Sequence, residues 1–490
     1  MEIFLIIVYT IALSLIFLYS LAQLNLLVNY IKAQKNQEEQ QVFDFSVPEQ
    51  IPFVTIQLPV YNELYVMERL LNSIGKIIYP KEKLEIQVLD DSTDESLEIT
   101  RQKVKDLRQK GFNISQIRRV NRKGFKAGAL KEGMKDAQGE YLAIFDADFM
   151  PQPDFLLKTI PHFKDPKIGV VQTRWGHINR DYSLLTKMQA FALDAHFTIE
   201  QVGRNTKHHF INFNGTAGVW RKACILDAGN WHSDTLTEDL DLSYRSQLKG
   251  WKFKYLEDVE TPAELPVVIS AARSQQFRWN KGGAENFQKM NRRLIFDKNL
   301  PFKTKIHGLI HLLNSSMFLS IFIVAILSIP MLYIKGMRPE YKSFFQFTSL
   351  FVLSTLIFFA CYWVAYKRIH GKGIRSFGNY VRDFFFFFSV AMGFSLHNSM
   401  AVLEGHIGKK SAFIRTPKFN VTQLKDSWKN NKYLQGKLSF INYVEGLLVL
   451  YFLFGIISAF KLTDYGLLPF HLMLFFGFGF VFYKSVTCRT

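Results

Sequence analysis

The sequence predicts an α/β domain with a doubly wound parallel sheet, inserted between membrane-spanning helices. Residues 3–31 and the chain after residue 306 are rich in apolar side chains, whereas residues 32–305 have the composition of a soluble domain. Within that soluble part, short apolar runs alternate with segments of helical periodicity. This alternation is typical of parallel strands joined by crossover helices.

The charge and the cysteines narrow the possible classes of function. A net charge of +18 suits either nucleic acid or an anionic membrane surface. No nucleic-acid-binding module is recognisable, so we expect the lipid bilayer and no nucleic acid. The three cysteines, Cys224, Cys361 and Cys488, are too scattered for a disulfide framework or a zinc site. The soluble domain is therefore expected to face the reducing cytoplasm.

The first apolar segment predicts a transmembrane helix over residues 1–32. Residues 3–31 contain no charged side chain, and about 20 apolar residues are enough to cross a bilayer. A cleaved signal peptide is the alternative, but the acidic Glu2 precedes the segment and the apolar stretch is too long. Lys32 and Lys35 follow it, so the positive-inside rule places the next residues in the cytoplasm.

Four apolar runs predict the strands of the soluble domain. They cover residues 53–60, 84–89, 114–120 and 141–145, with helical periodicity over 66–78, a charged helix after residue 94 and a helix that Gly124 opens. The carboxyl ends of parallel strands are where ligands bind in such sheets. The polar loops after these strands are therefore candidate binding loops, although acidic residues there commonly only cap the next helix.

Asp146 and Asp148 follow the strand at 141–145 and form the central motif of the chain. Two carboxylates at this spacing can approach one divalent cation together. Oxygen ligands suit Mg²⁺ or Mn²⁺, which commonly share their coordination with substrate phosphates. A solvated acidic turn would show the same pattern.

Two other stretches could bind a nucleotide. Asp90 and Asp91 end the second strand and could accept hydrogen bonds from a base or ribose. Lys126 lies at the start of the helix after Gly124, where a diphosphate could meet both its charge and free backbone amides.

The second half of the soluble domain supplies a candidate base and a candidate sugar platform. Residues 237–241 hold three carboxylates at the start of a helix, where the helix dipole favours acids. The functional alternative is a general base that takes a proton from an acceptor hydroxyl.

In the run from Gln275 to Trp279, Arg278 offers fixed donors to phosphate and Trp279 offers a flat face for a sugar ring. Residues 213–218 are expected to form a tight loop before a helix.

These motifs, in this order, resemble those of the processive, inverting family 2 glycosyltransferases, such as the cellulose, hyaluronan and chitin synthases. The motifs are Asp90-Asp91, Asp146-x-Asp148, Thr237-Glu238-Asp239 and Gln275-x-x-Arg278-Trp279. Their neighbouring residues are still more similar to the plant cellulose synthase-like proteins that make mannan, glucomannan or the xyloglucan backbone. The resemblance covers residues 50–290 and implies a cytoplasmic glycosyltransferase domain of the GT-A type.

The resemblance also implies the roles of the site residues. Asp239 is expected to be the catalytic base, and Asp148 with Asp146 the metal ligands. Donor binding is expected from Asp90, Asp91, Lys126, Asp146, Gln275 and Arg278. Acceptor binding is expected from Trp279, Asn214, Gly215, Thr216 and Glu238.

The membrane half is expected to contain a basic interfacial segment and two pairs of transmembrane helices. The segments are 291–307 (interfacial), 308–366 (two helices), 367–440 (an interfacial helix and a loop) and 441–484 (two helices). We expect Phe384–Leu403 not to cross the membrane, since crossing would place the basic residues of 404–440 outside, against the positive-inside rule. Glu445, within the fourth segment, is expected to face protein or the glycan path rather than lipid.

A loop in the third of these segments resembles the gating loop of bacterial cellulose synthases, which has the pattern Phe-x-Val-Thr-x-Lys. Here the residues are Phe413, Arg415, Thr416 and Lys418, with Arg415 in place of valine. In the relatives this loop lies over the donor nucleotide on the cytoplasmic side.

Together these features predict an inverting polysaccharide synthase of the plasma membrane or a Golgi-type membrane. Its donor would be UDP-glucose or GDP-mannose, and its acceptor a growing β-1,4-glycan that it extrudes across the bilayer. One alternative is a single-transfer enzyme that glycosylates a ceramide or a polyprenyl phosphate. The other is a channel or adaptor that keeps an inactive transferase domain. The sequence leaves the hexose and the oligomeric state open.

Overall fold

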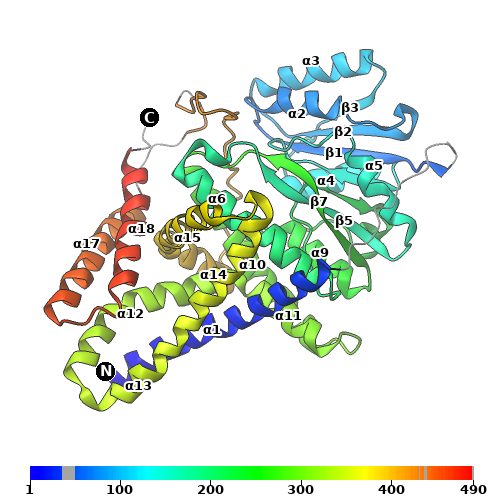
Figure 1. Ribbon diagram of the computed structural model, residues 1–490. Coiled ribbons are helices and arrows are strands. Elements are labelled where there is room, and N and C mark those ends of the chain that lie inside the picture. The colour runs from blue at the N-terminus through cyan, green and yellow to red at the C-terminus, as the bar shows by residue number, and fades with distance from the viewer. Residues whose placement is uncertain (36–49, 430, 435–438, 488–490) are drawn as a thin grey trace.

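The computed structural model describes residues 1–35, 50–429, 431–434 and 439–487. It confirms an α/β domain attached to a bundle of long apolar helices (Figure 1). Cys488 lies outside the described residues, whereas Cys224 and Cys361 are buried free thiols. The two described cysteines therefore form no disulfide with each other.

The α/β domain is built on one seven-stranded sheet with the order β3-β2-β1-β4-β6-β5-β7. The strands are β1 (Val54–Val60), β2 (Leu84–Asp90), β3 (Asn113–Ile117), β4 (Tyr141–Ile144), β5 (Ile168–His177), β6 (Gly218–Arg221) and β7 (Lys252–Ala263). The four strands predicted from apolar runs are all present and mutually parallel.

The sheet is mixed rather than wholly parallel, because β6 runs antiparallel to both β4 and β5. The loop at residues 213–217 therefore leads into a strand, and the expected helix, α8 (Lys222–Asp227), begins only after that strand. A strand of four residues is too short to show the alternation by which strands are recognised in a sequence.

Helices cover both faces of the sheet and enclose two hydrophobic clusters. On one face lie α2 (Met67–Ile74) and α3 (Ser96–Gln109), and on the other α4 (Phe125–Asp136), α8 and α9 (Glu238–Leu248). The remaining helices of this domain are α5 (Phe155–Thr159), α6 (Leu184–Ala195) and α7 (Gln201–Asn205), with a π-helical turn at His196–Glu200 between the last two. Because these helices cover the faces of the sheet and not its edge, the carboxyl ends of β1, β2 and β4 are left accessible to a ligand.

A 28-residue helix, α10 (Ile269–Phe296), connects the sheet domain to the membrane half. The sequence predicts that the soluble domain closes near residue 290, but α10 continues beyond it. The expected basic segment is then divided between the end of α10 and a separate short helix, α11 (Phe302–Leu312).

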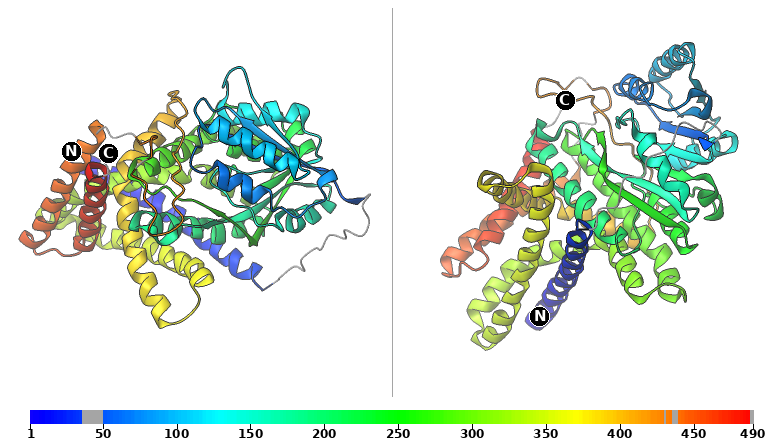
Figure 2. Two further views of the ribbon diagram at one scale, coloured as in Figure 1. Left: turned by 90° about the horizontal axis from the view of Figure 1, so that it is seen from above. Right: turned by 45° about the vertical axis from the view of Figure 1, so that its right-hand side comes forward.

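The membrane half contains the long apolar helices, including the N-terminal one. They are α1 (Glu2–Ala33), α12 (Met317–Met337), α13 (Lys342–Thr348), α14 (Val352–His370), α15 (Ile374–Gly393), α16 (Ser395–His406), α17 (Phe440–Lys461) and α18 (Leu468–Thr487). Helix α1 packs against α12 and α14 and extends with them away from the sheet (Figure 2).

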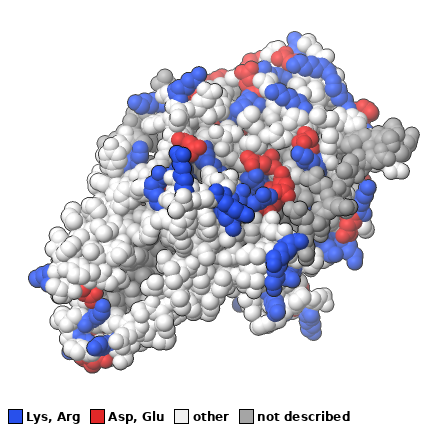
Figure 3. Space-filling view, viewed as in Figure 1, with Lys and Arg blue, Asp and Glu red and all other residues white. Residues whose placement is uncertain are grey.

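Five segments among the described residues are long and apolar enough to cross a membrane. They are Glu2–Ala33, Asn314–Met337, Pro339–His370, Phe440–Lys461 and Leu468–Thr487. In the face shown in Figure 3, charged side chains gather over the sheet domain and at the far tip of the bundle, and the area between is almost free of them. This distribution suits a bilayer around the bundle.

The run predicted not to cross, Phe384–Leu403, forms parts of α15 and α16, which meet at a bend of 51°. Such a bend is typical of a broken span or of a re-entrant segment, and α16 packs along α10 of the sheet domain. Glu445 is fully buried and pairs with Arg273 of α10. It therefore faces protein, as the sequence predicts.

Candidate active site

The ends of β1, β2 and β4 form the floor of one cleft. Two adjoining pockets of about 110 and 120 Å³ make up this cleft. Their shared lining comes from α4, the β4 end, α10 and the loop after α16, namely Lys126, Asp146, Asp148, Arg278, Phe413 and Lys418. Residues that lie far apart in the chain thus meet at the edge of the sheet where parallel strands place their ligands.

Of the two aspartates that end β2, Asp91 lines the cleft and Asp90 does not. Asp90 is 1% exposed, and its carboxylate accepts hydrogen bonds from the backbone of Ser92 at 2.9 Å and from Gln116 Nε2 at 2.7 Å. Asp91 accepts from Arg119 Nε at 2.9 Å. Asp90 therefore holds the β2 and β3 ends together, while Asp91 borders the cleft with both carboxylate oxygens paired to Arg119.

Asp146 and Asp148 both border the two pockets. Lys126 Nζ lies 2.6 Å from Asp146 Oδ1, and Lys418 pairs with Asp148. The backbone amide of Asp146 donates to Thr216 Oγ1 at 2.9 Å, which joins the β4 end to the loop at residues 214–216. Two carboxylates on one wall are a donor set that fits Mg²⁺ or Mn²⁺.

Asp239 lies in the first turn of α9 and lines one of the two pockets, whereas Asp91 lines the other. Gly215 (φ +80°) passes so close that a Cβ at this position would lie 3.0 Å from Asp239 Oδ2. Burial and the neighbouring Glu238 carboxylate raise the pKa of Asp239 to about 7, although Lys126 opposes them. A carboxylate with a pKa near neutrality is suited to general-base catalysis.

Gln275, Arg278 and Trp279 project from one face of α10, as their spacing of three and four residues requires. Arg278 Nη2 donates to Thr416 Oγ1 at 2.8 Å, and its guanidinium lies 4.8 Å from the centre of the Phe413 ring. Burial lowers the pKa of Arg278, but an arginine keeps its charge in a protein. Its positive charge therefore faces the cleft.

The segment 411–419, which we call the cover loop, lies across the cleft. Its ends are fixed: Lys281 Nζ donates to Ser411 Oγ at 2.7 Å, and the amide of Phe419 donates to Glu264 Oε1 at 3.0 Å. Between these ends, Phe413 stacks on Phe125 with the ring centres 5.2 Å apart, and Arg415 pairs with Glu63 at 2.7 Å. The arginine that replaces valine of the gating pattern thus has an acidic partner.

A third cavity, of about 350 Å³, lies among the membrane helices and shares Leu193 and Trp279 with the cleft. Its walls come from α1, α6, α12, α14 and α15 and are mostly apolar. The exceptions include Tyr19, Gln23, His196, Glu200, Gln276 and Asn314. Trp279 therefore borders both the catalytic cleft and a cavity that leads into the membrane half.

Several cleft residues were not assigned a role from the sequence. Tyr61 and Glu63 follow β1, and Arg122 lies with its guanidinium 3.4 Å from the centre of the Tyr61 ring. Tyr61 and Glu63 could have been found, since they follow a predicted parallel strand. Arg122 lies in an irregular stretch before α4 and no pattern marks it.

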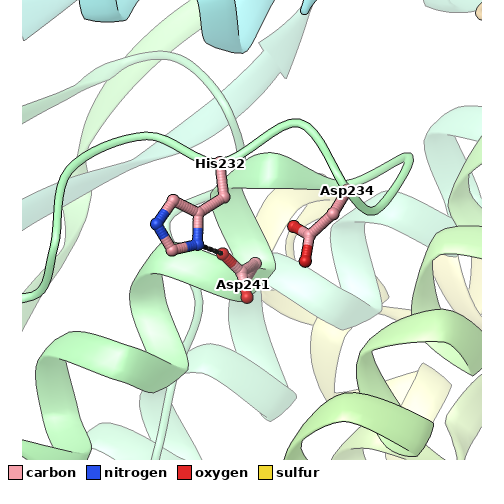
Figure 4. A group of neighbouring side chains, drawn as sticks. All are labelled: His232, Asp234 and Asp241. Atoms are coloured by element: carbon pink, nitrogen blue, oxygen red, sulfur yellow. Dashed lines mark ion pairs between the residues drawn. The ribbon is translucent and has the colours of Figure 1, made fainter.

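A separate cluster of His232, Asp234 and Asp241 brings three possible metal ligands within 4.8 Å of one another (Figure 4). Asp241 is buried and already pairs with Arg245 at 2.8 Å and with Lys289 at 2.7 Å. These cations balance the carboxylates. Asp241, the last acid of the run at 237–241, therefore anchors α9 and is not part of the cleft.

Comparisons with known proteins agree with this geometry. The family model described as glycosyl transferase family 2 matches residues 55–225, and that of glycosyl transferase family group 2 matches residues 141–366. Together these ranges contain the β-strand ends, Asp239 and the α10 motif.

Curated relatives come from plants. Probable glucomannan 4-beta-mannosyltransferase 4 of Oryza sativa subsp. japonica is 45% identical over 261 residues, which are 52% of this chain and 48% of the relative. Glucomannan 4-beta-mannosyltransferase 2 of Arabidopsis thaliana is 44% identical over 261 residues, with shares of 52% and 49%. The chain thus spans about half the length of the curated relatives it matches.

Among solved structures, mannosyltransferase PcManGT from Pyrobaculum calidifontis, in complex with GDP-Man and Mn²⁺, has a TM-score of 0.52. It is 18% identical and the match covers 81% of this chain and 100% of that one. At this level of identity the similarity concerns the fold, and it confirms a GT-A-like domain.

Proposed function

We propose that this chain, whose residues 55–225 and 141–366 match the models of glycosyl transferase family 2 and family group 2, is a membrane-embedded polysaccharide synthase of that family. It transfers hexosyl units from a nucleotide sugar to the 4-hydroxyl of a growing β-1,4-glycan, with inversion, and extrudes the product across the bilayer. The observation that supports this best is the position of Trp279, which borders both the catalytic cleft and the membrane cavity.

We favour a mannosyl unit over a glucosyl unit. The relatives at 44–45% identity are named as glucomannan 4-beta-mannosyltransferases. GDP-mannose is accordingly the first donor to test and UDP-glucose the second. The two sugars differ in the orientation of the 2-hydroxyl, so the choice depends on the polar groups around the sugar.

The donor binds across the cleft floor. Asp91 and the stacked pair of Tyr61 and Arg122 hold the nucleoside, and Lys126 and Arg278 face its diphosphate. Asp146 and Asp148 would hold Mg²⁺ or Mn²⁺, which would neutralise charge on the departing nucleoside diphosphate. Lys418 pairs with Asp148, so this ion pair would have to open before Asp148 could hold the ion.

Asp239 acts as the base. The terminal acceptor sugar lies on Trp279, with its 4-hydroxyl directed to Asp239 and to the anomeric carbon of the donor. Asp239 takes the hydroxyl proton as the oxygen attacks from the face opposite the diphosphate, so the configuration inverts. Asn214, Gly215 and Glu238 line this position and contact the acceptor or support the base. Thr216, predicted as an acceptor contact, is fully buried beside them and supports the end of β4 through the amide of Asp146.

The lengthened chain then moves from Trp279 into the membrane cavity. We place the cleft on the cytoplasmic side, because the cover loop contacts cleft residues and follows a basic stretch. Phe384–Leu403 then stays on, or returns to, that side. The plasma membrane or a Golgi-type membrane suits such an enzyme.

The test is the product itself. Purified enzyme in detergent or nanodiscs is incubated with GDP-mannose and with UDP-glucose separately, and the products are analysed for linkage and length. We expect long β-1,4-linked mannan from GDP-mannose and none from an Asp239→Asn variant. Glycolipids bearing one sugar would instead identify the enzyme as a lipid glycosyltransferase, and no turnover of either donor would contradict the proposal.

A further inference from the structure

Helices α6 and α7 follow each other directly along the chain and are separated only by a π-helical turn at His196–Glu200. Such turns interrupt the regular helical pattern and are common at functional sites. The side chains of His196 and Glu200 line the membrane cavity. Neither has a role in the reaction proposed above.

Glu200 connects the turn to the N-terminal membrane helix. Its Oε1 accepts a hydrogen bond from Gln23 Nε2 of α1 at 2.7 Å, and its Oε2 lies 3.1 Å from Arg204 Nη2 and 3.0 Å from His196 Nδ1. Burial favours the protonated acid, but Arg204 and His196 outweigh it and hold the pKa of Glu200 well below its usual range. Glu200 is therefore a carboxylate and can only accept.

The hydrogen-bonding capacity of each group then fixes the tautomer of His196 and the orientation of Asn214. Since Glu200 accepts, the Nδ1 of His196 carries a proton, and in the neutral ring Nε2 then offers a lone pair. That lone pair lies 3.2 Å from Asn214 Nδ2, which donates to it. On the other side, Gln201 Nε2 donates to Asn214 Oδ1 at 2.6 Å. Both polar atoms of the Asn214 side-chain amide therefore have a hydrogen-bond partner.

Asn214 begins the loop that joins the catalytic groups. The carbonyl of Gly215 accepts from Lys126 Nζ at 2.8 Å, and Thr216 Oγ1 accepts from the amide of Asp146 at 2.9 Å. Gly215 also passes against the carboxylate of Asp239. A shift of Asn214 therefore displaces the neighbours of the base and of the metal ligand.

We propose that His196 and Glu200 are positioning residues that set the catalytic loop through the amide of Asn214, and that Gln23 brings the N-terminal membrane helix into this arrangement. The inference rests on the proposed function, because its main readout is sugar transfer. In this arrangement the membrane helix α1 supports the geometry around the base Asp239 through three consecutive hydrogen bonds.

Three substitutions of His196 separate its two hydrogen bonds. His196→Gln can keep an acceptor near the position of Nε2, His196→Asn can keep a donor near that of Nδ1, and His196→Leu keeps neither. We expect kcat to fall about tenfold in the leucine and asparagine variants, which is about 1.4 kcal/mol in the barrier, and much less in the glutamine variant. The KM for the donor should stay within about twofold, because the nucleoside contacts are distant.

A double-mutant cycle tests whether His196 acts through Asn214. In an Asn214→Ala background, His196→Leu should lower kcat little further, because the amide that His196 orients is absent. Gln23→Leu should lower kcat in the same direction but less. Thermal unfolding and elution of each variant in detergent serve as controls for folding.

The outcomes distinguish this inference from the proposed function. If the wild type transfers no sugar, the proposed function fails. If the wild type is active and His196→Leu is folded and equally active, the positioning role is wrong. The positioning role is also wrong if His196→Leu lowers kcat by the same factor in the Asn214→Ala background as in the wild type. It is wrong again if the His196→Asn variant keeps a higher kcat than the His196→Gln variant.

Discussion

Replacing Asp239 by asparagine should abolish most of the turnover and leave the donor bound. The change keeps the shape of the side chain and removes its ability to take a proton. General-base catalysis typically contributes a factor of about 10²–10⁴, or about 3–5 kcal/mol in the barrier. Burial and Glu238 make Asp239 a stronger base than a free carboxylate, so we expect a loss of about 10³ in kcat. Asp91 and Arg278 remain, so donor affinity should barely change.

The assay has two parts: release of nucleoside diphosphate under saturating donor and acceptor, and donor binding by calorimetry. Asp234→Asn is the matched control, since it lies five residues before Asp239 and its side chain is 60% exposed. This control should keep wild-type kcat. A variant Asp239→Asn that binds donor weakly but turns over normally once bound would identify Asp239 as a donor ligand and refute the assignment.

Four other predictions follow from the site. Asp148→Ala should abolish turnover, as should EDTA added to the wild type, with Mg²⁺ or Mn²⁺ restoring only the latter; an active variant would remove Asp148 from the metal site. Trp279→Ala should impair elongation more than hydrolysis of the donor, whereas equal losses would indicate a packing role. Activity should decline as the pH falls through about 7, because the pKa of Asp239 is raised and the base becomes protonated. Glu238→Gln should move this decline to lower pH, because loss of the neighbouring charge lowers the pKa of Asp239. A cysteine at Ser427 should resist impermeant reagents outside intact cells, and its labelling would overturn the proposed topology.

The sequence predicted those parts of the fold that repeat a pattern over many residues. The apolar runs of β1, β2 and β4 and the long helices of the membrane half were recognisable because burial of whole segments leaves a continuous signal. The antiparallel β6 was missed, since its four residues are placed by pairing with β4 and β5. The boundary between α11 and the following span was likewise missed, because residues 308–312 at the end of α11 continue into the apolar run without a marked break.

Some of the candidate site residues lie together in the structure, tertiary contacts decide where others lie, and the roles of all of them stay predictions. Asp146, Asp148, Asp239 and Arg278 meet in one cleft, as their motifs imply. Asp90 does not reach it, because hydrogen bonds with the β3 end hold its carboxylate inward. No local pattern distinguishes it from Asp91.

The role of His196 illustrates the same limit. Its neighbours, Glu200 on the same helix and Asn214 in the catalytic loop, become partners only through the π-helical turn. Regular helical periodicity would not indicate that turn. Contacts of this kind depend on backbone irregularities that a sequence pattern does not encode.

The most direct test of the account is whether synthesis and extrusion are coupled. Membrane vesicles with the catalytic domain outward receive labelled donor, and an endo-β-1,4-glycanase is added outside after synthesis. We predict long labelled chains that largely resist the glycanase until detergent opens the vesicles. Chains digested equally with and without detergent, or products bearing a single sugar, would contradict a polymerase that passes its glycan from Trp279 into the membrane cavity.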